Sequence, residues 1–546
     1  MKKLLIVTLL LLPGVTAFAQ PEWESGEIKD VQIEIVKDRQ IVLPQANRLF
    51  DKIPPRPVEN SKQQFSYDFK AFNFSTPELS PVIRPLRLKQ EDPANAYRGY
   101  VSGGFGNYGT PYLDAFVTSK QDKKKLLGAH AYYRHSNKGP VDGKNSAGGI
   151  SGISAFAQTF SKELSFNGNV GYKKRSTHFY GYPENTEVDR DTIKQTYSLF
   201  SMGLGLANAR SSDFAYQLGA NFGHLRDNYA AAESAVDFNF KGSYKISDSR
   251  SIQIKGTYAI LNRKDEGIEA KARSLFQASG GYSFSTKTNL KLQIGVAVAY
   301  ENDTINTKDF HVYPDIKATY PISDAVDFVG SLSGGMEKVS LQSLSNENIW
   351  LAPGVNLAHT NKGFDLQGGI RAKVASTVLI GAGLSIAVLK DMYFFVNDTT
   401  DASKFMVIYD DLRRVNLYAS VLFTHGDNFR LSIQGDYFGY NNGDLQEAYH
   451  KPGYRLTSGV SYNLFKKLIF NADLIAQGNM KAFDLETGKN TTLDPAFDLS
   501  FRAEYLVSDR FSAFLELNNV IGNKYPVFMN YPVRGFQGLV GLTWKF

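Results

Sequence analysis

Alternating apolar and polar positions run through most of the chain. In residues 497–505, every second side chain is apolar or aromatic, and the side chains between them are polar or charged. Residues 236–246 repeat this alternation. Because successive side chains of a β-strand point to opposite faces, such segments predict strands with one apolar and one polar face. The pattern continues over residues 97–546 and predicts an all-β fold, a large antiparallel transmembrane β-barrel.

A tyrosine that precedes a short polar turn recurs at a regular interval. Tyr244, Tyr282 and Tyr320 are 38 residues apart, and Tyr505 precedes a similar turn. A membrane-spanning strand takes about 9–11 residues, so the interval fits two strands with one tight turn and one looser connection. The repeat therefore predicts a hairpin unit, with the tyrosine at one membrane interface, where aromatic side chains are enriched.

Short polar segments between alternating runs predict the number of strands. The eleven predicted turns lie at 119–125, 161–164, 209–213, 247–250, 285–288, 322–325, 360–363, 389–391, 425–428, 464–467 and 507–510. They imply about 22 strands, within a range of roughly 20–24. Longer connections are predicted at 136–151, 183–195, 262–272, 397–405, 440–453 and 478–495. In bacterial outer-membrane barrels the short turns are periplasmic and the longer loops lie outside.

The alternation also predicts which side chains face lipid. Phe238 and Phe501 lie on the apolar face of their strands, and Asn239 and Arg502 lie on the polar face. We expect the first pair to contact lipid and the second pair to line the lumen.

The N-terminus predicts a secretory signal peptide over residues 1–19. Lys2 and Lys3 precede an apolar run over 4–12, and 17–19 form a small-x-small cleavage site. A membrane anchor is the alternative, but the apolar run is too short and Pro13 interrupts it. The rest of the chain contains no apolar run long enough for a spanning helix, so we expect membrane embedding by strands.

Residues 20–96 predict a proline-rich periplasmic extension ahead of the barrel at 97–546. This segment carries nine of the chain's 20 prolines and scattered aromatic residues. Prolines interrupt it too often for a long helix, and its apolar residues are too dispersed for a core of its own. An extended segment is expected to dock, either in the barrel lumen or on a periplasmic partner protein.

Composition narrows the class of protein further. The 546-residue chain is 42% hydrophobic, 13% aromatic and 21% charged, and it contains no cysteine. A helical membrane bundle would be more apolar, whereas a barrel has a polar lumen. Without cysteine, disulfides, thiol catalysis and a lipoprotein anchor are excluded. The formal net charge of +7 comes without a basic cluster, so we expect outer-membrane lipid as a partner and not nucleic acid.

Motifs of catalytic or metal chemistry are weak in this chain. Gly104–Gly109 matches G-x-G-x-x-G, but strand-like segments flank it on both sides, so a hairpin tip is expected. The acidic segments 397–401 and 184–189 lack calcium-loop spacing. No metal-binding motif is formed by the eight histidines His130, His135, His178, His224, His311, His359, His425 and His450. We predict no enzyme activity, metal or cofactor; a barrel hydrolase with its triad dispersed over separate strands is the open alternative.

The last strand carries a candidate assembly signal. Val540, Leu542, Trp544 and Phe546 fall on one face, and the residues between them fall on the other. A final strand that ends on an aromatic residue resembles the recognition signal of bacterial outer-membrane barrels.

The closing stretch 497–546 resembles the end of a TonB-dependent receptor barrel, of the type found in the Bacteroidota. The resemblance rests on Leu517, Asn518, Asn519 and Tyr525 together with the terminal aromatic, and on an opening hairpin over 97–116. Such receptors place a plug of well over a hundred residues before the barrel, and residues 20–96 contain no recognisable plug. A strand-like patch at 31–36 fits either a TonB-contacting box or an ordinary periplasmic strand.

Two functions follow from these observations. The first is a transport pore, related to TonB-dependent receptors, for an unidentified solute. The second is a scaffold for envelope assembly or secretion that docks periplasmic partners through residues 20–96. A barrel of about 22 strands has a lumen wide enough to leak. We therefore expect the extension, inward loops, a partner or a flattened barrel to close it.

Overall fold

The computed structural model describes residues 97–546, except 120–121, 123, 184–185, 209–211 and 304–308. The predicted signal peptide, the proline-rich extension and the patch at 31–36 lie outside the described residues.

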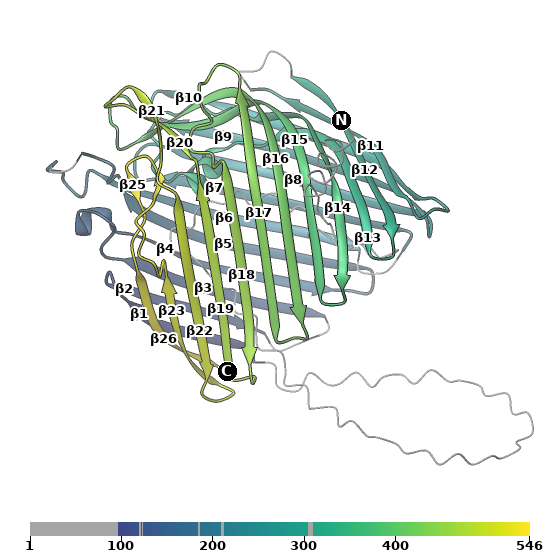
Figure 1. Ribbon diagram of the computed structural model, residues 1–546, viewed down its shortest axis with the longest axis horizontal. Coiled ribbons are helices and arrows are strands. Elements are labelled where there is room, and N and C mark those ends of the chain that lie inside the picture. Colours follow the sequence, from purple (N-terminus) through teal and green to yellow (C-terminus); the bar gives the residue numbers. More distant parts are fainter. Residues whose placement is uncertain (1–96, 120–121, 123, 184–185, 209–211, 304–308) are drawn as a thin grey trace, which may run out of the picture.

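Twenty-two of the described strands form one closed antiparallel sheet (Figure 1). The strands are β1 (Gly99–Gly106), β2 (Thr110–Thr118), β3 (Lys125–Ser136), β4 (Gly148–Phe160), β5 (Leu164–His178), β6 (Lys194–Asn208), β7 (Phe214–Asp227), β8 (Ala232–Ser247), β9 (Arg250–Asp265), β10 (Ile268–Ser285), β11 (Lys291–Glu301), β12 (Phe310–Ser323), β13 (Val326–Glu337), β14 (Thr360–Ala375), β15 (Val378–Asn397), β16 (Phe405–His425), β17 (Phe429–Asn442), β18 (Tyr454–Leu464), β19 (Leu468–Gly478), β22 (Ala496–Leu506), β23 (Phe511–Asn518) and β26 (Gln537–Lys545). Each strand pairs with the next along the chain, and β26 pairs with β1, with Tyr100 opposite Lys545. The predicted fold class is confirmed.

Smaller elements lie in the connections at one end of the barrel. These are the 3-10 helix η2 (Gly143–Ser146), the helix α3 (Leu341–Glu347), the hairpin of β20 (Lys481–Asp484) and β21 (Lys489–Thr492), and the hairpin of β24 (Pro526–Phe528) and β25 (Tyr531–Pro532). We call this the long-loop end, and the opposite end the short-turn end. Within the described part of the chain, no helix is both long enough and apolar enough to cross a membrane.

The two faces of the wall follow the predicted alternation. Phe238 is 48% exposed on the outside, whereas Arg502 is buried and its Nη1 lies 3.1 Å from Oε2 of Glu516. The repeated tyrosines Tyr244 and Tyr320 are exposed on the outside, next to the short turns. The wall therefore presents an apolar surface with an aromatic girdle outward and a polar lumen inward, as a membrane-spanning barrel requires.

Nine of the eleven predicted turns lie at the short-turn end, and two predictions were wrong. Residues 360–363 and 389–391 lie inside β14 and β15, which meet instead at a turn over 376–377. The β14–β15 ladder shifts register between Lys362 and Phe364, and the β15–β16 ladder shifts register between Leu389 and Met392. Such bulges add a residue and interrupt the alternation, so they look like turns in the sequence.

The predicted loop at 262–272 was also wrong. Strands β9 and β10 continue into it and leave only residues 266–267 as a connection, with Gly267 in the left-handed region at φ 67°. The longest connection at this end, 338–359 between β13 and β14, was missed among the predicted loops.

A charge on the outer face should destabilise the barrel, whereas the same change one residue along should not. Phe238→Arg should lower the free energy of unfolding by about 2–4 kcal/mol, because Phe238 lies near the middle of its strand and faces outward. Asn239→Arg, on the lumen face, should cost less than about 1 kcal/mol. Urea unfolding in lipid vesicles measures both changes. A larger cost for Asn239→Arg would show that the two faces are exchanged.

Candidate functional site: a cap folded into the barrel

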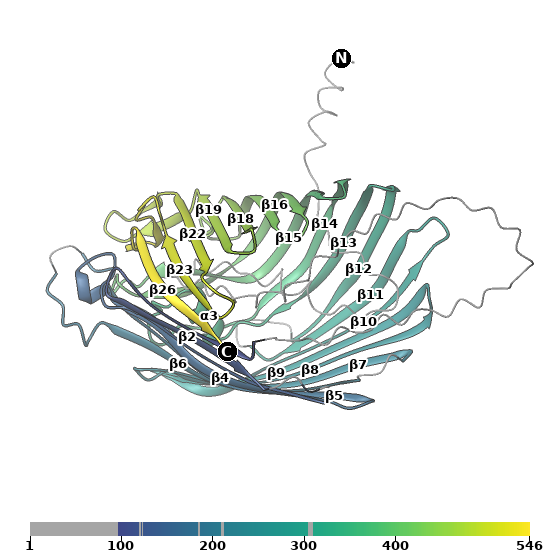
Figure 2. The same ribbon diagram turned by 90° about the horizontal axis from the view of Figure 1, so that it is seen from below.

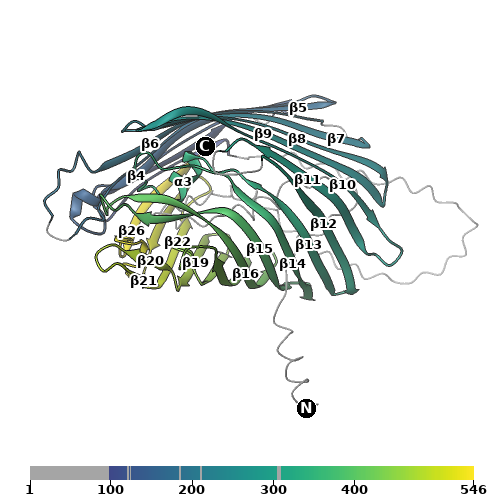
Figure 3. The same cartoon turned by 90° about the horizontal axis from the view of Figure 1, so that it is seen from above.

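The connection 338–359, which we call the cap loop, turns inward instead of extending from the rim. Figures 2 and 3 show its helix α3 within the ring of strands. The sequence favours a helix start at this point. The Ser340 side chain accepts a hydrogen bond from the Ser343 backbone N–H, and the Ser343 hydroxyl accepts one from the Ser340 backbone N–H. This capping box satisfies two backbone donors that would otherwise be unpaired.

Lumen-facing side chains hold α3 at both ends. The buried carboxylate of Glu233 on β8 accepts hydrogen bonds from the backbone N–H groups of Leu341 (2.8 Å) and Gln342 (3.0 Å). Arg175 on β5 donates from Nη1 to the carbonyl of Ser345 at 3.1 Å and to Asn346 at 2.9 Å. A carboxylate at the start of a helix and a guanidinium at its end also suit the helix dipole.

The cap loop packs into a cluster of five aromatic rings, which we call the aromatic hub. Its members are Tyr180, Trp350, Phe405, Phe528 and Tyr531. The ring centroids of Trp350 and Tyr531 are 4.0 Å apart, and those of Tyr180 and Tyr531 are 4.7 Å apart. Trp350 Nε1 also donates to the carbonyl of His178 at 3.0 Å. Burial of such rings is among the strongest stabilising contributions a loop can make.

The aromatic hub joins distant parts of the wall. Tyr180 follows β5, Phe405 begins β16, and Tyr531 belongs to the connection between β23 and β26. Because β5 and β16 are eleven steps apart in a ring of 22 strands, they lie on opposite sides of the barrel. The apolar cluster around the cap loop therefore spans the lumen at the long-loop end.

A polar clip fastens both ends of the cap loop to the wall. Arg273 on β10 binds Asp303 through two hydrogen bonds of 2.6 and 3.0 Å, and it donates to the carbonyl of Val339 at 3.0 Å. The Nδ1 atom of His359 lies 3.0 Å from the Val339 backbone nitrogen and 3.1 Å from Arg273 Nη2. Val339 and His359 stand near the beginning and at the end of the cap loop, so one arginine holds both.

Two neutral histidines lie in this region, His359 at the end of the cap loop and His450 in the connection between β17 and β18. Both neighbours of His359 Nδ1 are hydrogen-bond donors, so this atom must accept and carries no proton. Similarly, His450 Nδ1 donates to the carbonyl of Phe395, and its Nε2 accepts from the Met529 backbone N–H at 3.1 Å. Burial lowers the pKa of each imidazole to about 4. Each ring can keep its hydrogen bonds only while it stays uncharged.

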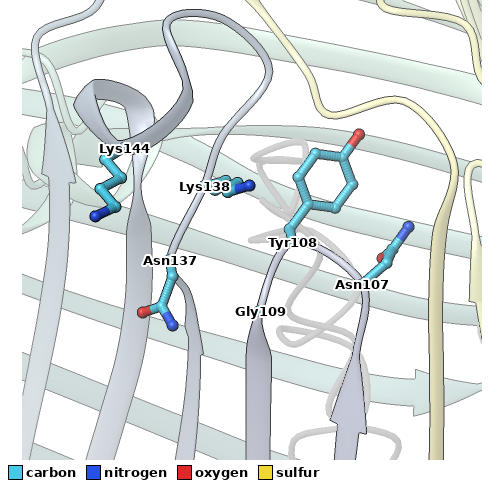
Figure 4. Close-up of a pocket in the computed structure, with 6 residues that line it drawn as sticks. All are labelled: Asn107, Tyr108, Gly109, Asn137, Lys138 and Lys144. Carbon is cyan, nitrogen blue, oxygen red and sulfur yellow. The ribbon is translucent and has the colours of Figure 1, made fainter.

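A pocket of about 490 Å³ opens at the rim of the long-loop end (Figure 4). It is lined by Asn107, Tyr108, Gly109, Asn137, Lys138 and Lys144. Neither lysine ammonium group has a carboxylate partner among the described residues. Arg534 and Arg190 bring further positive charge, since each donates from Nε, at 3.2 Å, to the backbone carbonyl of one of these lysines. Basic side chains therefore surround the pocket, whose own wall is mostly apolar.

The residues singled out in the sequence lie in different parts of the structure and make different contacts. Gly104–Gly109 forms the β1–β2 hairpin, as predicted, with Gly109 at φ 61°. In segment 397–401 the Asp398 carboxylate binds Thr400, and the Asp401 carboxylate binds Ser403 and Lys404. Across the described residues, no three His, Asp or Glu side chains are grouped to hold a metal ion. The terminal strand exposes Val540, Leu542, Trp544 and Phe546 on the outside.

Comparisons with known proteins support the fold. No protein-family profile matches the chain, and no curated protein matches it in sequence. Among solved structures, the FrpB iron transporter from Neisseria meningitidis is similar, with a TM-score of 0.64, 10% identity, and coverage of 83% of this chain and 82% of that one. The ferric-catecholate import receptor Fiu from E. coli K12 has a TM-score of 0.63 and 9% identity, with coverage of 83% of this chain and 82% of that one. The siderophore receptor PirA from Acinetobacter baumannii has a TM-score of 0.62 and 11% identity, with coverage of 82% of this chain and 80% of that one.

These likenesses agree with the resemblance to TonB-dependent receptors at the level of the fold. At such low identity they carry the barrel architecture and nothing finer. The cap loop has to be interpreted from its own contacts.

Proposed function

We propose that the chain is an outer-membrane transport barrel for a small solute, and that the cap loop is its gate. The observation that carries this proposal is the apolar cluster that spans the lumen from β5 to β16 and is fastened by a few polar contacts. A loop held in this way can leave without breaking the strand ladder. The transport functions in the names of the similar structures support the same assignment.

The clip offers a test of this function. Arg273→Met should raise the conducting fraction in planar bilayers tenfold or more, because it removes charged hydrogen bonds to Val339 and His359 of the cap loop, each worth about 1.5–3 kcal/mol. Arg371→Met is the matched control, since Arg371 pairs with Asp327 across β13 and β14 at 2.6 Å, next to the short turn at the end opposite the cap loop. The control should stay closed. Absence of current in both variants, with and without residues 20–96, would favour the scaffold function instead.

We further propose that the short-turn end faces the periplasm. The first strand begins at Gly99 on this end, so residues 20–96 would lie in the periplasm after removal of 1–19. A periplasmic protein partner would then meet residues 20–96, and TonB would be tested through residues 31–36. Short turns on the periplasmic side agree with the general architecture of such barrels.

We also propose that the outward residues of β26 direct barrel assembly. Trp544 and Phe546 are exposed on the outside at the seam between β26 and β1, where an assembly machinery could reach them. Changing both residues to Ser should reduce the heat-modifiable barrel in outer-membrane fractions severalfold. Thr543→Ala, on the lumen face of the same strand, is the control. Normal amounts of folded barrel in the double variant would contradict the proposal.

A further inference from the structure

The last turn of α3 places oxygen acceptors against cations from two sides of the lumen. Glu347 accepts from Lys451 Nζ at 3.0 Å and from the Tyr393 hydroxyl. In the same turn, the Ser345 carbonyl and the Asn346 amide oxygen accept from Arg175 of β5. Glu347 and Lys451 are both mostly buried, at 17% and 15% exposure. The oxygen atoms at the end of the helix therefore occupy positions that the oxygens of an anionic ligand would take.

More cations of the same wall lack a carboxylate partner. Arg414 lies opposite Tyr440 on the β16–β17 ladder, and its buried Nε has no hydrogen-bond partner within the described structure. Arg455 on β18 donates from Nε to the neutral amide of Gln477 at 3.1 Å and lies within electrostatic range of Glu347.

The nearest carboxylate of the wall is already engaged. Asp436 stands opposite Arg455 on the ladder, yet its two oxygens accept from the amides of Asn416 (3.1 Å) and Gln434 (3.0 Å). A buried guanidinium normally finds a carboxylate or phosphate that matches its planar donors. Arg414 and Arg455 therefore share one wall carboxylate, Asp436, and this excess of positive charge leaves room for a further anion beside Glu347.

We propose that Arg175, Lys451, Arg455 and Arg414 form a binding site for an anionic solute that bears carboxylate or phosphate groups, and that Glu347 occupies this site as an internal substitute. This inference rests on the proposed transport function and names its solute class. An arriving anion takes over the cations that hold α3. The cap loop then loses its anchors on β5 and on the β17–β18 connection, and the open state gains population.

The rim pocket supports the same solute class independently. Lys138 and Lys144 line an open pocket at the same end of the barrel as the cap loop. Positive charge at the mouth of a pore raises the local concentration of anions and speeds their entry. The two basic regions would act in sequence, the first at the rim and the second beneath the cap loop.

Binding to the purified full chain tests the inference. The probes are citrate, inorganic pyrophosphate and the neutral sugar sucrose, measured by titration calorimetry. Glu347→Gln removes the internal competitor, so it should bind at least one of the two anions about tenfold more tightly than the unchanged chain. Combined Arg175→Gln and Arg455→Gln changes should weaken that binding at least tenfold. Binding of citrate alone or pyrophosphate alone would identify the carboxylate or the phosphate source.

Matched variants separate the site from general lumen charge. Lys317→Gln removes a lumen cation that lies 3.9 Å from Asp315 on β12, and it should leave anion binding unchanged. Arg455→Lys keeps the charge and should keep most of the affinity. The inference is overturned if neither anion binds, if sucrose binds equally well, if Glu347→Gln binds no more tightly, or if Lys317→Gln loses as much affinity as the arginine pair.

Trp350 reports opening separately from transport. With Trp23 and Trp544 changed to Phe, acrylamide should quench Trp350 more strongly once the anion is added, because this side chain is buried in the closed cap. Anion binding and quenching without any bilayer current would leave this site intact and contradict the transport function. Current without anion binding would contradict this site and leave the transport function intact.

Discussion

Shortening the cap loop should convert the barrel into a steadily open pore. Replacing residues 340–357 with a short Gly-Ser linker removes α3, Trp350 and the hydrogen bonds of α3 to Arg175 on β5 and Glu233 on β8. The wall itself should persist, because Glu337 and Thr360 already pair directly across β13 and β14. A hairpin can therefore close where the loop was. Planar bilayers should show large steady currents in place of a closed baseline.

A second loop deletion provides the control for this experiment. Replacing 483–490, the tip of the β20–β21 hairpin, removes a smaller protrusion at the same end without touching the aromatic hub. This variant should stay closed. A version of the cap deletion that also lacks residues 20–96 shows whether the extension obstructs the lumen. Absence of current from both forms of the cap deletion would contradict the gate.

Acid should open the cap. His359 and His450 have pKa values of about 4 in the closed state because burial disfavours their charged forms, whereas an exposed histidine has a pKa near 6.5. The closed state therefore keeps its full stability above pH 6.5 and loses it as the pH falls from 6.5 to 4, where the open state binds more protons. His359, the histidine within the cap loop, contributes roughly 3 kcal/mol across this interval, and His450 adds to it through its packing against Phe405 and Phe528 of the aromatic hub. Conductance and Trp350 quenching should both rise steeply below pH 6.

The charged groups around His359 also affect its pKa. Arg273 contacts its ring, Lys338 adds to the positive charge around it, and Asp303 opposes them with a carboxylate. For Asp303, burial raises the pKa, but hydrogen bonds and charge from Arg273 and His359 bring it below its usual value. This carboxylate therefore stays charged throughout the interval in which the histidines titrate.

Neutral substitutes test whether histidine protonation is the cause. His359→Asn and His450→Gln keep a hydrogen-bonding side chain at each place and cannot gain charge in this range. The double variant should remain closed down to about pH 4.5. His425→Asn, at the exposed short-turn end of β16, is the control and should respond to acid as the unchanged chain does. Acid opening in the double variant would assign the effect to other groups.

The barrel fold could be predicted from a local pattern in the sequence, the alternation of apolar and polar residues. Period-two alternation marks strands wherever one face meets lipid and the other meets water, so the strand number and most short turns could be predicted from the sequence. The outward placement of Phe238 and Tyr244 follows from the same period. Alternation misleads where a bulge interrupts the period, as at Lys362 and Leu389, because an added residue and a turn look alike in a linear pattern.

The cap loop was decided by tertiary structure. A break in alternation after Glu337, a Ser-x-x-Ser helix start and the apolar run 349–351 were visible in the sequence, but they do not say whether the loop points inward or outward. Its direction depends on Glu233, Arg273 and Arg175, which stand 66 to 170 residues away in the chain on other strands. Closure of the ring brings these side chains together with a loop from the far wall. Alternation along a strand specifies a face, whereas contacts across a lumen depend on which strands end up opposite each other.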